Sequence, residues 1–176
     1  VGIMQGKIDI IPVIRNLNHW PRFRLRLFVE GAWVGLLSGI VISFFRWCLE
    51  AGTRLREQVY ALLMQAGWVE NTVWFVFLLM AAYVLYRLKQ HEPEASGSGI
   101  PQVKGIILGV VRLRWLRVLW VKLAGGILGI GLGLSLGREG PSIQLGAVTA
   151  QGMSRALGRS RMEERYLITA GASAGL

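Results

Sequence analysis

Two long apolar runs constrain this chain more than any other feature of its sequence. Residues 31–49 contain one charged side chain, Arg46, and residues 71–86 contain none. A helix needs about 20 consecutive apolar residues to cross the hydrocarbon core of a bilayer. Tryptophans and tyrosines lie near both ends of the second run, as they do at membrane interfaces. The sequence therefore predicts an all-α, polytopic integral membrane protein with the lipid bilayer as its surroundings.

The composition excludes several other classes of protein. The chain has 176 residues, a formal net charge of +10 and 53% hydrophobic residues. This apolar content excludes intrinsic disorder, which requires low hydrophobicity. Cys48 is the single cysteine, so a disulfide-stapled secreted domain is excluded as well. A basic chain can indicate a nucleic-acid partner, but here the positive charges gather at the ends of apolar segments. We therefore expect no nucleic-acid partner.

The positions of the basic residues predict an orientation. Five of them precede residue 29, against a single aspartate: Lys7, Arg15, Arg22, Arg24 and Arg26. Arg87 and Lys89 follow the second run. Because lysine and arginine are enriched in cytoplasmic segments, the N-terminus and residues 87–96 are predicted inside and residues 50–70 outside. We divide the chain into a cytoplasmic N-terminal segment, residues 1–28, and a transmembrane domain, residues 29–176.

The rest of the chain is less regular. Residues 100–111 are apolar but too short to span and are followed by three arginines, which predicts a re-entrant helix. Residues 118–136 are long enough to cross, and further helices are expected at 141–157 and 166–176. Glycines at spacing four, at 31, 35 and 39 and again from 125 to 137, predict close helix packing.

Two breaks in the apolar sequence carry the functional hypothesis. SGSGIP spans residues 96–101 and GREGP spans residues 137–141. Each combines glycine with a proline suited to the first turn of a helix, so each predicts a helix N-terminus at membrane depth, with Ser98 as a candidate N-cap. Helix N-termini attract anions, and paired broken helices form transporter sites. Glu139 is a candidate competitor for such an anion, since it would leave the site when protonated.

Structural explanations of these residues stay open. Either motif alone could mark only a kink, and Glu139 could be an ion-pair partner of Arg138 or Arg117. Lys104 and Lys122 are expected to snorkel or to form ion pairs. No cluster of metal-ligating residues is evident, so no metal and no cofactor are expected.

The two motifs resemble the ion-binding signatures of the CLC chloride channel and transporter family. GSGIP continues as QVKG to Gly105, and GREGP continues as SIQLGA to Ala147. The order of spans and short helices is also similar over nearly all of the chain after about residue 20. The resemblance implies the first inverted repeat of a CLC-type fold.

The resemblance also implies roles for individual residues. Ser98 would coordinate the anion, with Gly99 and Ile100 beside it, and Glu139 would be the gating and proton-accepting glutamate. The second motif would contribute the anion-binding stretch of Gly140, Pro141, Ser142 and Ile143, with backbone amides of this stretch facing the ion. A serine at position 98 is the family's chloride-type residue. The family's second repeat, with a GxFxP motif and an ion-coordinating tyrosine, is absent from this sequence, so we expect the chain to be the N-terminal part of a homodimeric protein.

Several functions follow from these observations. The preferred hypothesis is chloride/proton antiport in the plasma membrane of a prokaryote, and the alternative within transport is a passive voltage- or pH-gated chloride channel. A glycine-zipper scaffold without transport activity is the alternative of another class. Enzymes are disfavoured: the glycines do not complete a dinucleotide-binding GxGxxG, and neither Ser98 nor Ser173 has the GxSG pattern of an intramembrane serine protease.

Overall fold

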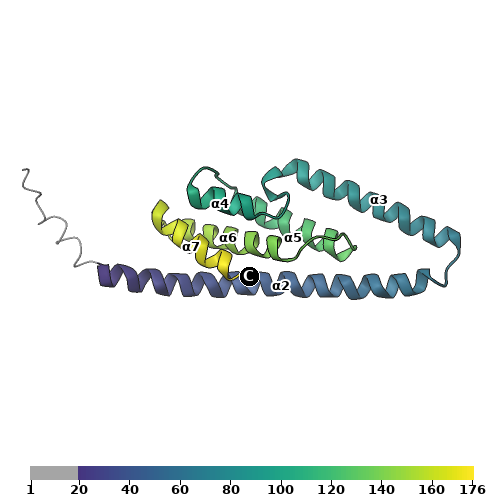
Figure 1. Ribbon diagram of the computed structural model, residues 1–176, viewed down its shortest axis with the longest axis horizontal. Coiled ribbons are helices and arrows are strands. Elements are labelled where there is room, and N and C mark those ends of the chain that lie inside the picture. Colours follow the sequence, from purple (N-terminus) through teal and green to yellow (C-terminus); the bar gives the residue numbers. More distant parts are fainter. Residues whose placement is uncertain (1–19) are drawn as a thin grey trace, which may run out of the picture.

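The computed structural model describes residues 20–176, with side chains from residue 25 onwards. The described chain is helical: α2 (Trp20–Leu63), α3 (Trp68–His91), the short 3-10 helix η1 (Pro93–Ala95), α4 (Ile100–Leu108), α5 (Trp115–Gly131), α6 (Glu139–Ala156) and α7 (Arg161–Ser173). Figure 1 shows α2 as a long rod along one side, and α5, α6 and α7 pack against it while α4 lies on the far side of α6 and α7. Most of the predicted N-terminal segment, residues 1–19, lies outside the described residues.

Two helices have the length and composition of membrane spans. They are Leu25–Leu63 within α2 and Trp68–His91, which is α3. At 1.5 Å per residue the 44 residues of α2 extend about 66 Å, twice the thickness of a hydrocarbon core. The predicted span at residues 31–49 therefore continues as helix through residues 50–63. α2 also runs through position 28, which was predicted to be the end of the N-terminal segment.

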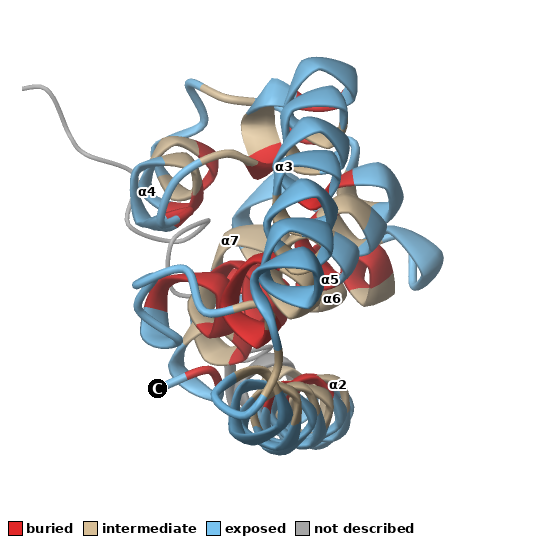
Figure 2. Cartoon of the chain, turned by 90° about the vertical axis from the view of Figure 1, so that its right-hand side faces the viewer, coloured by how far each residue is buried: buried red, intermediate tan, exposed pale blue. Residues whose placement is uncertain are grey.

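The outer surfaces of these helices are apolar. Ala81 is the one buried residue within α3, while Val73, Phe75 and Met80 are at least 60% exposed. Figure 2 shows the same pattern, with exposed residues covering α2 and α3 and buried residues concentrated near α6. An apolar surface of this size fits contact with lipid, which agrees with the membrane segments that the sequence predicts.

α6 lies at the centre of the bundle. Twelve of its 18 residues are buried, and it packs against α2, α4, α5 and α7. Small residues allow this packing: a Cβ at Gly146 would meet the backbone carbonyl of Gly171 in α7. The predicted ladder at Gly31, Gly35 and Gly39 behaves differently, because no described atom lies within 4 Å of a Cβ built there. Close approach between helix backbones therefore occurs at Gly146 and Gly171, and not at the three glycines of the predicted ladder.

The short helices match the expected breaks. α4 has nine residues, too few to span, as predicted for residues 100–111. α5 ends at Gly131, whereas a continuous span to residue 136 was predicted. The helix stops there because Gly133 has φ +101° and residues 134–137 are irregular, which frees the chain to begin α6 at Glu139.

Candidate anion site

The first motif forms a tight loop between η1 and α4. Gly97 and Gly99 have φ +71° and +83°, a left-handed conformation that favours glycine. Gly99 is the N-cap of α4, and no side chain caps the helix, so the prediction that Ser98 is the N-cap is wrong. A Cβ at Gly99 would also collide with the side chain of Gln144 in α6. The loop therefore requires glycine both for its backbone angles and for its fit against α6.

The second motif brings the start of α6 to the same place. α6 begins at Glu139, and Gly140 packs directly on the backbone of Ser98. A Cβ at position 140 would lie 2.5 Å from the Ser98 carbonyl oxygen and 3.0 Å from its Cα. Real Cβ atoms do not make such contacts, so only glycine allows this approach. The two motifs, about 40 residues apart in the sequence, thus meet at two helix N-termini.

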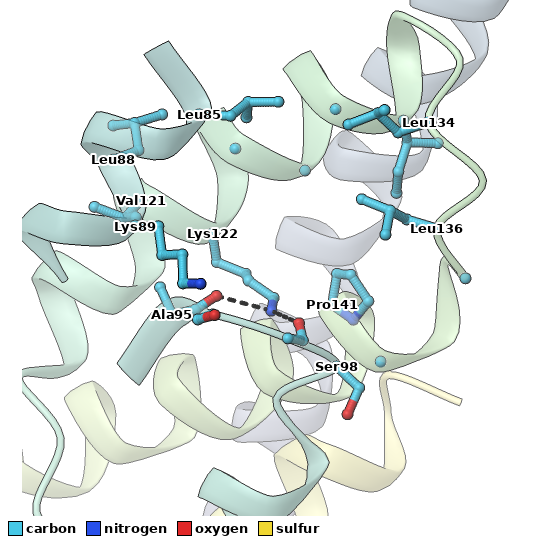
Figure 3. Close-up of a pocket in the computed structure, with 18 of the residues that line it drawn as sticks. Leu85, Leu88, Lys89, Ala95, Ser98, Val121, Lys122, Leu134, Leu136 and Pro141 are labelled. Carbon is cyan, nitrogen blue, oxygen red and sulfur yellow. Dashed lines mark hydrogen bonds between the residues drawn. The ribbon is translucent and has the colours of Figure 1, made fainter. Parts of the chain in front are cut away.

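A cavity of about 540 Å³ opens beside this contact (Figure 3). Five of the predicted site residues line it: Ser98, Ile100, Glu139, Gly140 and Pro141. The other three do not. Gly99 packs on Gln144, the Ser142 hydroxyl donates to the Arg138 carbonyl at 2.9 Å, and Ile143 packs in the apolar core. The Ser98 hydroxyl points to the side of its loop opposite Lys122 (Figure 3).

Backbone amides at both helix starts are free to face an anion. In α4 the first backbone N–H with a partner in its own helix is that of Val103, which donates to the Gly99 carbonyl. In α6 it is that of Ser142, which donates to the Arg138 carbonyl. The amides before them have no partner within their helix. Because the two helix dipoles also converge here, the local potential favours negative charge.

Lys122 of α5 is a further feature of the cavity. Its side chain is 5% exposed and its Nζ donates to the carbonyl oxygens of Ala95 and Gly97, at 3.0 and 2.6 Å (Figure 3). The expectation that Lys122 snorkels or forms an ion pair is wrong, since it is buried and no described carboxylate lies within ion-pair distance. The positive potential of the cavity therefore has a side-chain source as well as the two helix ends.

Two glutamines donate hydrogen bonds to the loop before α4, and these contacts were not predicted from the sequence. Gln144 of α6 donates to the Glu94 carbonyl at 2.8 Å, and Gln102 of α4 donates to the Ser96 carbonyl at 3.2 Å. Together with Lys122, they provide a side-chain donor to each of the four consecutive carbonyls at residues 94–97. The sequence does contain an indication of these contacts, namely long polar side chains within apolar helices. Such side chains need hydrogen-bond partners when they are buried.

Comparisons with known proteins identify the family of this chain. Residues 77–176, more than half of the chain and including both motifs, match the family described as "Voltage gated chloride channel". The chain belongs to the CLC chloride channel and transporter family. It is 34% identical over 166 residues to the H⁺/Cl⁻ exchange transporter ClcA of Cronobacter sakazakii, covering 93% of this chain and 36% of that protein. It is 36% identical over 154 residues to ClcA of Vibrio cholerae, covering 81% and 31%.

A solved CLC structure shows the same fold. The X-ray structure of a slow cyanobacterial Cl⁻/H⁺ antiporter superposes with a TM-score of 0.76 and 34% identity, over 85% of this chain and 36% of that chain. The fold class predicted from the sequence is thereby confirmed. The CLC relatives of this chain are bacterial membrane transporters and not enzymes. The chain spans about a third of the length of the relatives that it matches.

Proposed function

We propose that the full-length protein exchanges chloride for protons, with the cavity between α4 and α6 as its anion site. The contact between Ser98 and Gly140 carries this proposal, because it joins two helix N-termini at one cavity. Named exchange transporters among the relatives support it. The protein would act in the plasma membrane of a prokaryote, with a cytoplasmic N-terminus and as a homodimer.

The chemistry of the cavity suits a small monovalent anion. Backbone amides at the two helix starts and the Ser98 hydroxyl are the hydrogen-bond donors proposed to replace part of the hydration shell of chloride. Lys122, whose Nζ donates to the carbonyls of Ala95 and Gly97, adds positive charge to the cavity. Only a few donors surround the ion, so binding can stay weak enough for release, as conduction requires. The side chains of Ile100 and Pro141 add apolar walls that limit access of water.

Glu139 is proposed as the gate and proton acceptor. It is the first residue of α6 and lines the cavity, so its carboxylate is attracted to the same amides as the substrate anion. No described basic side chain lies within ion-pair distance of it, which disfavours the alternative of a partner in Arg138 or Arg117. A charged Glu139 carboxylate would occupy the anion site and exclude chloride. A protonated Glu139 would leave the site, so the uptake of a proton would be coupled to the entry of chloride.

The test uses the full-length protein reconstituted in liposomes. Glu139→Ala is expected to abolish proton pumping driven by a chloride gradient while chloride flux continues, because the proton acceptor is lost and the site is opened. Glu57→Ala, at an exposed carboxylate of α2 that does not line the cavity, is the control and should keep both activities. Undiminished proton pumping in Glu139→Ala would refute the role of Glu139. Chloride flux without any proton coupling in the unmodified protein would favour the channel.

A further inference from the structure

A second cavity lies at the other ends of α4 and α6. Its volume is about 250 Å³. Ile106 and Gly109 line it from the end of α4, and Gln151 and Arg155 line it from the end of α6. The first cavity lies instead at the starts of these helices, so the two cavities are separate sites. Arg112 belongs to a cluster of three arginines around the start of α5, and such clusters are typical of the cytoplasmic side of a membrane protein.

Four guanidinium groups surround this cavity. Arg112 comes from the segment before α5, Arg155 from α6, and Arg161 and Arg165 from α7. Glu164 is the one carboxylate among the lining residues, and it lies 3.4 Å from Arg155 Nε. Among the described side chains, no carboxylate lies within ion-pair distance of the other three arginines. Several like charges around one cavity repel each other unless an anion lies between them.

A buried amide also lines the cavity. Gln151 is 1% exposed, and its Oε1 has no hydrogen-bond partner in the described part of the chain. Buried polar groups without a partner are rare and require an explanation. Because the two ends of a glutamine amide can exchange by a rotation, Gln151 offers either a donor or an acceptor to a ligand.

The shape of the cavity depends on a glycine as well. Gly109 ends α4 with φ +79°, and a Cβ there would collide with Nη2 of Arg165. The guanidinium of Arg165 thus lies in the space that a side chain would occupy. This contact holds Arg165 between α4 and α7, where it can act with Arg112 on the same ligand.

We propose that this cavity binds a phosphate group. Arginine presents paired donors in a planar fork that matches two phosphate oxygens, whereas a single spherical ion cannot use that geometry. The volume is several times the ~30 Å³ that one water molecule occupies in the liquid, so a phosphate fits. The group could belong to the headgroup of an anionic lipid, which basic pockets between membrane helices bind, or to a soluble phosphate. The proposal does not depend on transport, since binding is measured without flux.

The experiment measures binding to the full-length protein in detergent at constant chloride concentration. The probes are short-chain phosphatidic acid, inorganic phosphate and, as a headgroup without net charge, short-chain phosphatidylcholine. Arg112→Gln, at an exposed position, should weaken phosphatidic acid binding about tenfold, and Arg112→Gln combined with Arg165→Gln should weaken it further, because each removes charged hydrogen bonds. Arg114→Gln is the matched control. Arg114 is two residues after Arg112 and its side chain does not line the cavity, so this substitution removes the same charge from outside the proposed site.

The outcomes separate the two sources of phosphate. Binding of phosphatidic acid alone, lost in the Arg112 variants and kept in Arg114→Gln, would support a lipid headgroup. Binding of inorganic phosphate with the same dependence would support a soluble phosphate. The proposal is overturned if neither phosphatidic acid nor inorganic phosphate binds, or if Arg114→Gln weakens binding as much as Arg112→Gln. Unchanged melting temperatures of the variants would show that the loss is not a loss of folding.

Discussion

The loop that carries Ser98 is held by side chains rather than by regular secondary structure. Lys122, Gln102 and Gln144 donate to the carbonyls of residues 94–97 from three different helices. A loop without such donors would leave buried carbonyls unsatisfied or mobile. The backbone that leads to Ser98 is therefore held in one conformation at the start of α4.

Gly140 provides a test at the level of a single residue. Gly140→Ala would place a methyl group 2.5 Å from the Ser98 carbonyl oxygen, and the neighbour is backbone that cannot easily move. Overpacking of this kind costs about 1–3 kcal/mol, so we expect a lower melting temperature and reduced chloride flux. Gly137→Ala is the control, because nothing lies within 4 Å of its Cβ. Equal flux from both variants would contradict the close contact of the two motifs.

At the level of elements, α7 has a well-defined start. Ser160 is its N-cap, and the Ser160 hydroxyl and the Glu163 carboxylate form a reciprocal capping box with backbone amides. Two backbone donors at the helix start are thereby satisfied. The hydrogen bonds with Ser160 also hold the pKa of Glu163 below its usual value. This polar helix start precedes the buried part of α7, where Gly171 packs against Gly146 of α6.

The capping box predicts a dependence of stability on pH. A lowered pKa means that the charged Glu163 stabilises the folded state above its unfolded pKa, and that this contribution is lost as the pH falls through the folded pKa. Ser160→Ala should cost about 1 kcal/mol near neutral pH and reduce this acid dependence. The melting temperature from pH 7 to pH 3 measures both. Ser173→Ala, whose hydroxyl only bonds to the Thr169 carbonyl, should leave the profile unchanged.

At the level of the whole molecule, the charge pattern supports the proposed membrane orientation. α2 and α3 expose apolar surfaces, and the ends of α4 and α6 lie beside arginines that precede α5 and begin α7. Arg159, just before α7, also pairs with Glu30 near the start of α2. These basic segments therefore lie together at one end of the bundle, which supports the proposed cytoplasmic face.

Cysteine labelling tests this orientation in the full-length protein. In a Cys48→Ser background, Gln65→Cys between α2 and α3 should react with an impermeant maleimide from outside. Val110→Cys, at an 81% exposed position before Arg112, should react only from inside. Met80→Cys in the middle of α3 should stay unlabelled from both sides, because lipid covers it. Labelling of Val110→Cys from outside would reverse the proposed orientation.

The membrane class, the helical fold and the two helix starts at the motifs could be predicted from the sequence alone. Those features depend on local properties: the length of apolar runs, the conformational freedom of glycine and the fixed φ of proline. Residues 50–70 have a polar pattern that is compatible with helix, but this pattern does not indicate that the helix of the first span continues without a break to Leu63. The Ser98 N-cap was wrong because Gly99 takes the left-handed position that ends the loop.

The set of residues that share a site follows from the packing of the helices and not from any local pattern. The tertiary structure placed Gly140 on the backbone of Ser98, separated Ser142 and Ile143 from the cavity, and brought Lys122 to the carbonyls of the loop. It also gathered arginines from the segment before α5, from α6 and from α7 around a second cavity. None of these contacts is local in the sequence. They arise because α6 packs among four other helices, and that packing depends on the three-dimensional fit of buried side chains.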